Sequence, residues 1–116
     1  MAKKRKNLES KLVAAVSDYL KLKGIFAWRQ NTGAAAYKNG GFVRFGLAGQ
    51  ADITGILPGG RRLEIECKAP KGVMSEHQKE FERKITANGG LYILARNVKD
   101  VDNILKLLKK DNGIPF

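Results

Sequence analysis

The chain has 116 residues, with 22 Lys or Arg and 11 Asp or Glu, so its formal net charge at pH 7 is +11. This length suits one domain with one hydrophobic core, and so large a positive charge favours a polyanionic partner, above all nucleic acid, over a basic surface that only aids solubility. One Cys and one His exclude an internal disulfide and argue against a zinc enzyme. With no signal peptide or long apolar run, we expect a cytoplasmic protein without a membrane segment.

The N-terminal part combines a basic run with a helical pattern. Residues 1–7 contain four consecutive basic residues and are predicted to form a mobile basic arm, which would contact phosphates or stay disordered. A helix is predicted from Asn7, as N-cap, to about Lys23, before Gly24. Glu9 falls in its predicted first turn, where an acid commonly complements the helix dipole. Residues 8–110 would form the single domain, followed by a tail at 111–116.

A short strand is predicted in the first half of 25–33, followed by a turn. Arg29 and Asn31 would share a face and reach a phosphate, although an exposed strand end explains them equally well. Trp28 is expected in the core. Residues 34–38 and 41–45 flank Asn39-Gly40 and predict a hairpin, on which Lys38 and Arg44 lie among aromatic residues. That mixture is typical of nucleic-acid surfaces, and a plain hairpin with a charged outer face is the alternative.

A second predicted hairpin, over 51–57 and 61–68, contains the main candidate site residues. The strand after Pro58-Gly59-Gly60 alternates strictly, which places Glu66 and Lys68 on its polar face. The simplest interpretation is a wet face with a solvated ion pair. If the hairpin brings Asp52 beside Glu66, however, the two carboxylates repel each other unless a cation lies between them. Oxygen ligands of this kind suit Mg²⁺ or Mn²⁺, and Lys68 would then help to position a nucleophile.

The remaining elements complete an α/β pattern. Lys71 belongs to a basic loop, and Ser75 with Gln78 forms a capping box that opens a helix ending at Gly89-Gly90. His77 is expected at the surface and not as a general base. The apolar run 91–96 predicts a central strand buried on both faces, and the last helix should start at Asn97 or Asp100. The predicted fold class is α/β, with a mixed central β-sheet flanked by helices.

Asp52, followed after a hairpin by Glu66-Cys67-Lys68, resembles the PD-(D/E)XK nuclease signature, with Ala51 where that superfamily usually has proline. From Leu8 to Leu108 the order of motifs resembles the virus-type replication-repair nuclease (VRR-NUC) branch, in its stand-alone phage or prophage form. The further matches are the acid on the first helix, the segment Arg29-x-Asn31-Thr32-Gly33, the Gly-rich approach to Asp52, and a glutamine at a helix start.

The resemblance implies a restriction-endonuclease-like core and a metal-dependent DNA endonuclease. Asp52, Glu66 and the backbone carbonyl of Cys67 would hold Mg²⁺ or Mn²⁺, and Glu9 would complete the acidic cluster directly or through water. Lys68 would orient and activate the attacking water, with Gln78 near the site. The substrate would be branched DNA, as in Holliday-junction resolvases, which act as homodimers. The alternatives are a flap or nicking nuclease, a non-catalytic DNA-binding module, and an RNA-binding protein suggested by charge alone.

Overall fold

The computed structural model describes residues 2–30, 33–36 and 42–112. Its helices and strands follow one another in the chain as α1 (Ala2–Leu22), β1 (Phe26–Arg29), β2 (Gly33–Ala36), β3 (Phe42–Phe45), β4 (Ile53–Ile56), β5 (Arg62–Cys67), α2 (Glu76–Ala87), β6 (Leu91–Ala95) and α3 (Val98–Asn112).

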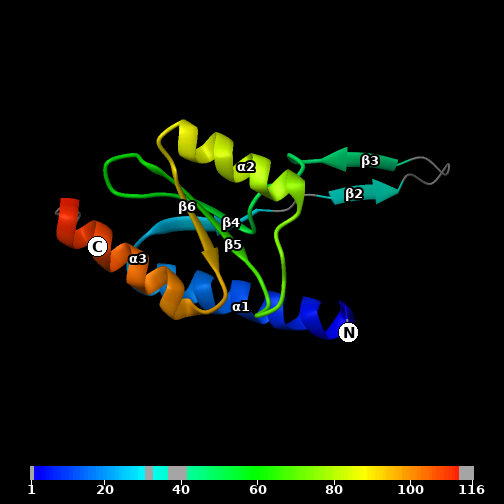
Figure 1. Cartoon of the computed structure of the whole chain (residues 1–116), viewed down its shortest axis with the longest axis horizontal. Helices are drawn as coiled ribbons and strands as arrows, with labels where there is room; N and C mark the ends of the chain where they lie inside the picture. Colours follow the sequence, from blue (N-terminus) through cyan, green and yellow to red (C-terminus); the bar gives the residue numbers. More distant parts are fainter. Residues whose placement is uncertain (1, 31–32, 37–41, 113–116) are drawn as a thin grey trace.

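Four strands form a mixed sheet in the order β1-β4-β5-β6. The β1–β4 and β4–β5 pairs are antiparallel, and β5–β6 is parallel. Helices α1 and α3 cover one face of this sheet and α2 lies on the other (Figure 1). The predicted α/β class with a mixed sheet flanked by helices is confirmed.

The core lies between the sheet and the α1–α3 layer. The alternation of β5 sends Leu63, Ile65 and Cys67 to this face, where they meet the apolar stripe of α1. That stripe includes Val16 and Leu20, both almost fully buried. Burial of these side chains supplies most of the driving force for folding, at about 1.5–3 kcal/mol for each large aliphatic group. Because the helices and strands dock through this one core, the ends of β4 and β5 are held in a fixed register.

The first helix begins at Ala2, so the prediction of an N-cap at Asn7 was wrong, as was that of a mobile arm before it. Lys and Arg are good helix formers, and no Gly or Pro interrupts the run, so the helix continues through the basic residues. The first turn of α1 therefore contains no acid. Glu9 lies two turns inside the helix, where a dipole-complementing role does not apply.

Strand β6 lies at an edge of the sheet and not in its centre, which corrects the prediction from its apolar run. Its two faces are nevertheless covered. Helix α3 packs on one side, and on the other Phe81 of α2 contacts Tyr92, with ring centroids 6.4 Å apart. A strand with helices on both faces needs apolar residues at every position, even when only one of its edges is paired. The strands with a partner on each side are β4 and β5.

Trp28 was expected in the core, but it is 40% exposed and stacks obliquely on Phe26, which is 66% exposed. Ala27 faces α1, so its neighbours in β1 point to the opposite face of the sheet. Helix α2 packs over β6 at the far side of that face and leaves the side chains of β1 open. The aromatic pair and Ile56, the β4 partner of Phe26, form an exposed apolar patch beside the edge of the sheet.

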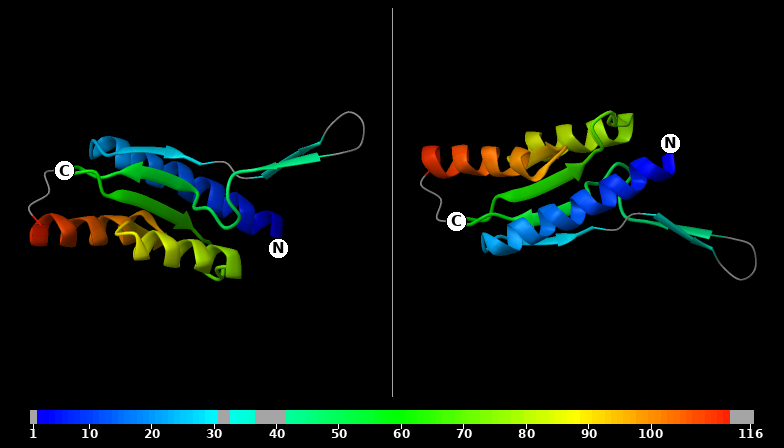
Figure 2. Two further views of the ribbon diagram at one scale, coloured as in Figure 1. Left: turned by 90° about the horizontal axis from the view of Figure 1, so that it is seen from above. Right: turned by 90° about the horizontal axis from the view of Figure 1, so that it is seen from below.

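The predicted hairpin before the Gly-rich segment is present as β2 and β3, which pair antiparallel from Gly33↔Phe45 to Ala36↔Phe42. It forms a separate two-stranded sheet. The hairpin projects from the body at the same end as the N-terminus of α1 (Figures 1 and 2). Its side chains lie outside the described part of the structure.

Candidate functional site

The β4–β5 ribbon brings Asp52 and Glu66 together. The register pairs Ile53 with Ile65 and Thr54 with Glu64, so one step further along the ribbon Asp52 lies opposite Glu66 on the same face. The backbone N–H of Cys67 donates to Oδ2 of Asp52 at 2.8 Å, which fixes the Asp52 carboxylate against the end of β5. The two acids proposed as ligands therefore converge at one point.

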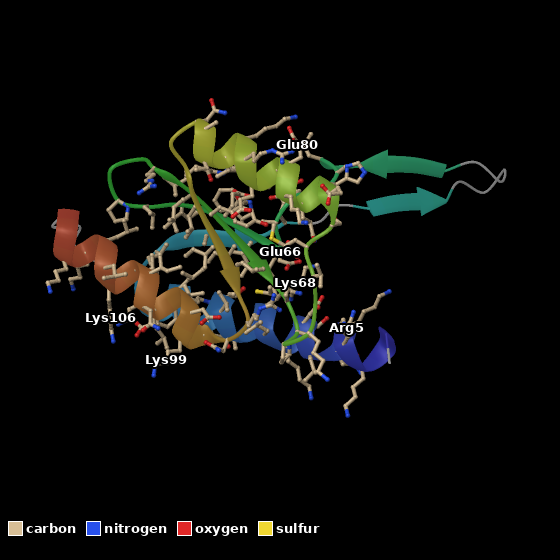
Figure 3. All side chains as sticks on the ribbon, in the orientation of Figure 1. Arg5, Glu66, Lys68, Glu80, Lys99 and Lys106 are labelled. Atoms are coloured by element: carbon tan, nitrogen blue, oxygen red, sulfur yellow. The ribbon has the colours of Figure 1, made fainter. Side chains whose placement is uncertain are left out.

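Lys68 and Gln78 meet the same pair. The Nζ atom of Lys68 lies 3.7 Å from Oε2 of Glu66, and Nε2 of Gln78 donates to that oxygen at 3.0 Å. Figure 3 shows Glu66 and Lys68 at the end of the sheet, beneath the start of α2. The structure thus assembles four of the predicted site residues from β4, β5 and the first turn of α2.

The polar face of β5 is not wet, which excludes the solvated-pair interpretation of Glu66 and Lys68. Glu66 is only 4% exposed and Glu64 is fully buried. Within the described part of the chain, Oε1 of Glu66 is buried and has no hydrogen-bond partner. A buried carboxylate oxygen without a partner is energetically costly, so this atom needs either a proton or a cation.

Burial raises the pKa of Glu66 to about 8, and the neighbouring charge of Asp52 adds to this effect. Burial also raises the pKa of Asp52, although the Cys67 N–H and the charge of Lys68 oppose the change. Both acids therefore resist carrying a full negative charge without a further cation. The unpaired Oε1 atom and the all-oxygen donor set together fit a hard divalent ion such as Mg²⁺ or Mn²⁺.

Glu9 approaches this centre but has another partner. Its Oε2 atom accepts a hydrogen bond from the N–H of Ala69 at 3.0 Å, so it supports the loop that follows Lys68. Its charge still contributes to the raised pKa of Asp52 and Glu66. Among the residues that the structure describes, no three or more His, Cys, Asp and Glu side chains form a metal-binding group. Glu9 therefore lies at the rim of the site.

Cys67 ends β5 with its thiol in the core, where burial raises the thiol pKa to about 12. The thiol is therefore neither a nucleophile nor a thiolate ligand at neutral pH. Its backbone carbonyl, between Glu66 and Lys68 in the chain, stays a predicted ligand.

The predicted capping box is confirmed, and its glutamine also reaches Glu66. The Oγ atom of Ser75 accepts from the N–H of Gln78 at 3.2 Å, and Oε1 of Gln78 accepts from the N–H of Ser75 at 2.9 Å. This leaves the amide nitrogen of Gln78 free of the cap and directed at Glu66. Gly49, with φ +79°, touches the same turn, because an added Cβ there would overlap the backbone carbonyl of His77. The Gly-rich approach predicted from sequence therefore seats α2 against the strand that carries Asp52.

Sequence inspection missed Arg96, which follows β6. Its Nη1 atom donates to the carbonyl oxygens of Ala69 at 2.7 Å, Pro70 at 3.2 Å and Gly72 at 2.9 Å. Together with Glu9, it holds the loop after Lys68 from both sides. The available signal was a cation at the end of an apolar run, but nothing local shows which loop such a cation contacts.

A hydrogen-bonded trio next to the acidic pair was also missed. Buried Glu64 accepts hydrogen bonds at Oε2 from the hydroxyl of buried Thr54 and from Nε of half-exposed Arg62, the latter at 2.7 Å. This trio lies one step along the ribbon from Asp52 and Glu66, on the same face. The Glu64 charge is balanced by Arg62, and its Oε1 atom, like that of Glu66, is buried without a partner among the described residues.

The predicted DNA-contacting residues are only partly placed. Arg29 ends β1 and lines a cleft with Asp52, while Lys71 is exposed on the loop after β5. Asn31 and Lys38 lie outside the described residues. Arg44 belongs to β3, for which the backbone alone is described. His77 is exposed in the first turn of α2, as expected.

No protein-family model, curated protein or solved structure matches this chain. No helix in the described ranges has the length and apolar character needed to cross a bilayer.

Proposed function

We propose that this protein is a divalent-metal-dependent DNA endonuclease with a restriction-endonuclease-like core of the VRR-NUC type. The observation that carries the proposal is that half-buried Asp52 lies beside buried Glu66 at one end of the β4–β5 ribbon. Among the described residues Oε1 of Glu66 has no partner, and the ammonium of Lys68 lies near its other oxygen. This is the arrangement that the Asp…Glu-x-Lys spacing implied.

Asp52, Glu66 and the carbonyl of Cys67 would hold Mg²⁺ or Mn²⁺, and Glu9, which is already bonded to Ala69, would act through water. The bound ion would neutralise charge on the phosphate and make water more acidic. Lys68 would orient the attacking water and stabilise the negative charge that develops on phosphorus oxygens. Gln78 keeps the Glu66 carboxylate in place through its amide.

The burial of the acids favours an enzyme over the alternative of a non-catalytic DNA-binding module. In such a module Asp52 and Glu66 would serve no purpose that outweighs the cost of burying two carboxylates side by side. A basic surface is enough to bind DNA, and the +11 charge already supplies it. Acidic residues at the same end of the molecule make sense when a cation bridges them to a phosphate.

For the substrate, we infer branched DNA cut by a homodimer, with flap or nicking activity as the nearest alternative. The open edge of β1 and the apolar patch of Phe26, Trp28 and Ile56 support a dimer, because a surface of that kind is commonly covered by a second copy. Two centres related by a two-fold axis would suit opposed cuts in a four-way junction.

The test is cleavage of four-way, flapped, nicked and linear DNA by the parent protein with Mg²⁺ or Mn²⁺, alongside Asp52→Asn, Glu66→Gln and Lys68→Ala. Each variant should lose at least about 100-fold in rate while circular dichroism shows it folded. Glu76→Gln, at an acid whose side chain is 86% exposed on α2, is the matched control and should cut like the parent. Folded site variants that cut as well as the control would contradict the proposal.

A further inference from the structure

Asp52 opens into a cleft between the N-terminal half of α1 and the end of β1. The cleft has a volume of about 250 Å³, and its α1 wall carries Lys6 and Glu9. Its other wall carries Arg29 and Gln30 from the end of β1, together with Asp52. Cations and acids thus line one cleft, and a site that processes a phosphodiester needs both, cations for the phosphates and anions for the metal.

The two cations are available to a ligand. In the part of the chain that the structure describes, neither Lys6 nor Arg29 forms an ion pair with a carboxylate, although Glu9 and Asp52 line the same cleft. Both side chains are exposed. Arg29 is close enough to the centre for its charge to lower the pKa of Cys67 against the opposing effects of burial and the nearby acids.

The position of Lys6 in α1 is unfavourable in the absence of an anion. The first turns of this helix contain Lys4, Arg5 and Lys6 and no acid, although the N-terminus of a helix carries the positive end of its dipole. The dipole therefore imposes a cost on these cations, which is greatest in the first turn and smaller at Lys6. An anion bound across these turns would remove that cost, because it would meet the side-chain charges and the dipole together.

A second groove extends the basic surface around the same helix. Lys4 and Arg5 line it with Lys71 of the loop after β5, and its volume is about 340 Å³. Figure 3 shows Arg5 on α1 at the end of the molecule where Lys68 lies, whereas Lys99 lies on α3, away from both. The first turns of α1 thus stand between two grooves, each with cations in its wall.

We infer that the cleft beside Asp52 is a phosphate subsite, in which Lys6 and Arg29 bind a backbone phosphate next to the one that is cut. Gln30 supplies a hydrogen bond, and the groove of Lys4, Arg5 and Lys71 carries the following phosphates. The basic segment is then a rigid part of the substrate-binding surface, with its cations held in register by the helix. This inference rests on the proposed nuclease function for the identity of the ligand, a phosphodiester chain.

The test measures binding of a short fluorescein-labelled DNA duplex by anisotropy, in EDTA, over a series of salt concentrations. Lys6→Ala and Arg29→Ala should each weaken binding about five-fold at low salt and reduce the slope of log K against log [salt] by about 0.9, the value for one phosphate contact. Lys6→Arg should keep both the affinity and the salt slope of the parent. Lys99→Ala is the matched control, since Lys99 is also an exposed lysine near the start of a helix, and it should change neither.

If Lys6→Ala and Lys99→Ala lower affinity equally, binding follows net charge alone and the subsite is wrong. If Lys6→Ala behaves like the parent, the subsite is also wrong. Cleavage assays test the nuclease proposal separately from the phosphate subsite. A parent that binds DNA through Lys6 but never cuts it would overturn the nuclease and leave the phosphate subsite standing. A parent that cuts DNA regardless of Lys6 would do the reverse.

Discussion

Replacing Glu66 by Gln should stabilise the metal-free protein at neutral pH. Burial raises the pKa of this carboxyl from 4.5 to about 8 in the folded state. The folded protein then binds more protons than the unfolded chain between these two values, so its stability falls as the pH rises through that window. Below about pH 4.5 the carboxyl is protonated in both states and contributes no penalty. Gln is neutral throughout and avoids the penalty.

The size of the effect follows from the two pKa values. With an unfolded pKa of 4.5 and a folded pKa of about 8, folding at pH 7 must protonate Glu66, and this lowers the unfolding free energy by about 3 kcal/mol. For a domain of this length, that corresponds to a rise of roughly 10 °C in Tm for Glu66→Gln. The gap between variant and parent should be near zero at pH 4 and largest at pH 8.

The assay is thermal unfolding followed by circular dichroism, in EDTA, at several pH values. Glu64→Gln is the matched control, because Glu64 lies two residues away on the same face of β5 but has Arg62 as a partner. That variant should lower Tm, since it weakens the charge-assisted hydrogen bond from Arg62 and disturbs the one from Thr54. A Glu66→Gln protein that is no more stable than the parent at pH 8, or a gap that does not grow with pH, would refute the reasoning about this pair.

Four further outcomes follow from the same contacts. Mg²⁺ at 100 times Kd should add about 2.7 kcal/mol to the unfolding free energy of the parent and so raise its Tm, whereas the Tm of Glu66→Gln should hardly change. Equal shifts in both proteins would place the ion elsewhere. Arg96→Ala should cost about 1–3 kcal/mol in urea unfolding and speed amide exchange in the loop after Lys68, whereas Arg83→Ala, on exposed α2, should do neither. Gly49→Ala should lower the unfolding free energy more than Gly59→Ala, because both glycines have positive φ but only a Cβ added at Gly49 meets backbone atoms. Similar losses of unfolding free energy would mean that the start of α2 shifts to make room. Trp28→Lys should make the protein monomeric by sedimentation equilibrium with little change in Tm, and a dimer that persists would move the interface away from the patch.

Much of the fold was predictable because it depends on neighbours in the chain. The alternation of β5, the turn at Pro58-Gly59-Gly60 and the Ser75–Gln78 capping box are short-range features, and each appears where the sequence indicated. The approach of Asp52 to Glu66 was also predictable. A short antiparallel hairpin allows few registers, and residues that face each other across it share one side of the sheet.

Apart from the start of α1, where the basic run extends the helix, the failures concern which elements pack against each other. The sequence does not show that α2 covers β6 and leaves β1 open, so Trp28 was misplaced in the core and β6 was misplaced in the centre of the sheet. It also does not show that Arg96 contacts the loop after Lys68, across a long separation in the chain.

By itself, then, the sequence determined which residues share a strand face, where α2 begins and which two acids meet. The tertiary structure alone decided that the polar face of β5 is buried, with the first turn of α2 in contact with Glu66. Burial raises the pKa of both acids, and Oε1 of Glu66 has no partner among the described residues. The physical reason is that alternation and capping act between near neighbours, whereas desolvation of a carboxylate depends on a helix that arrives from elsewhere in the chain.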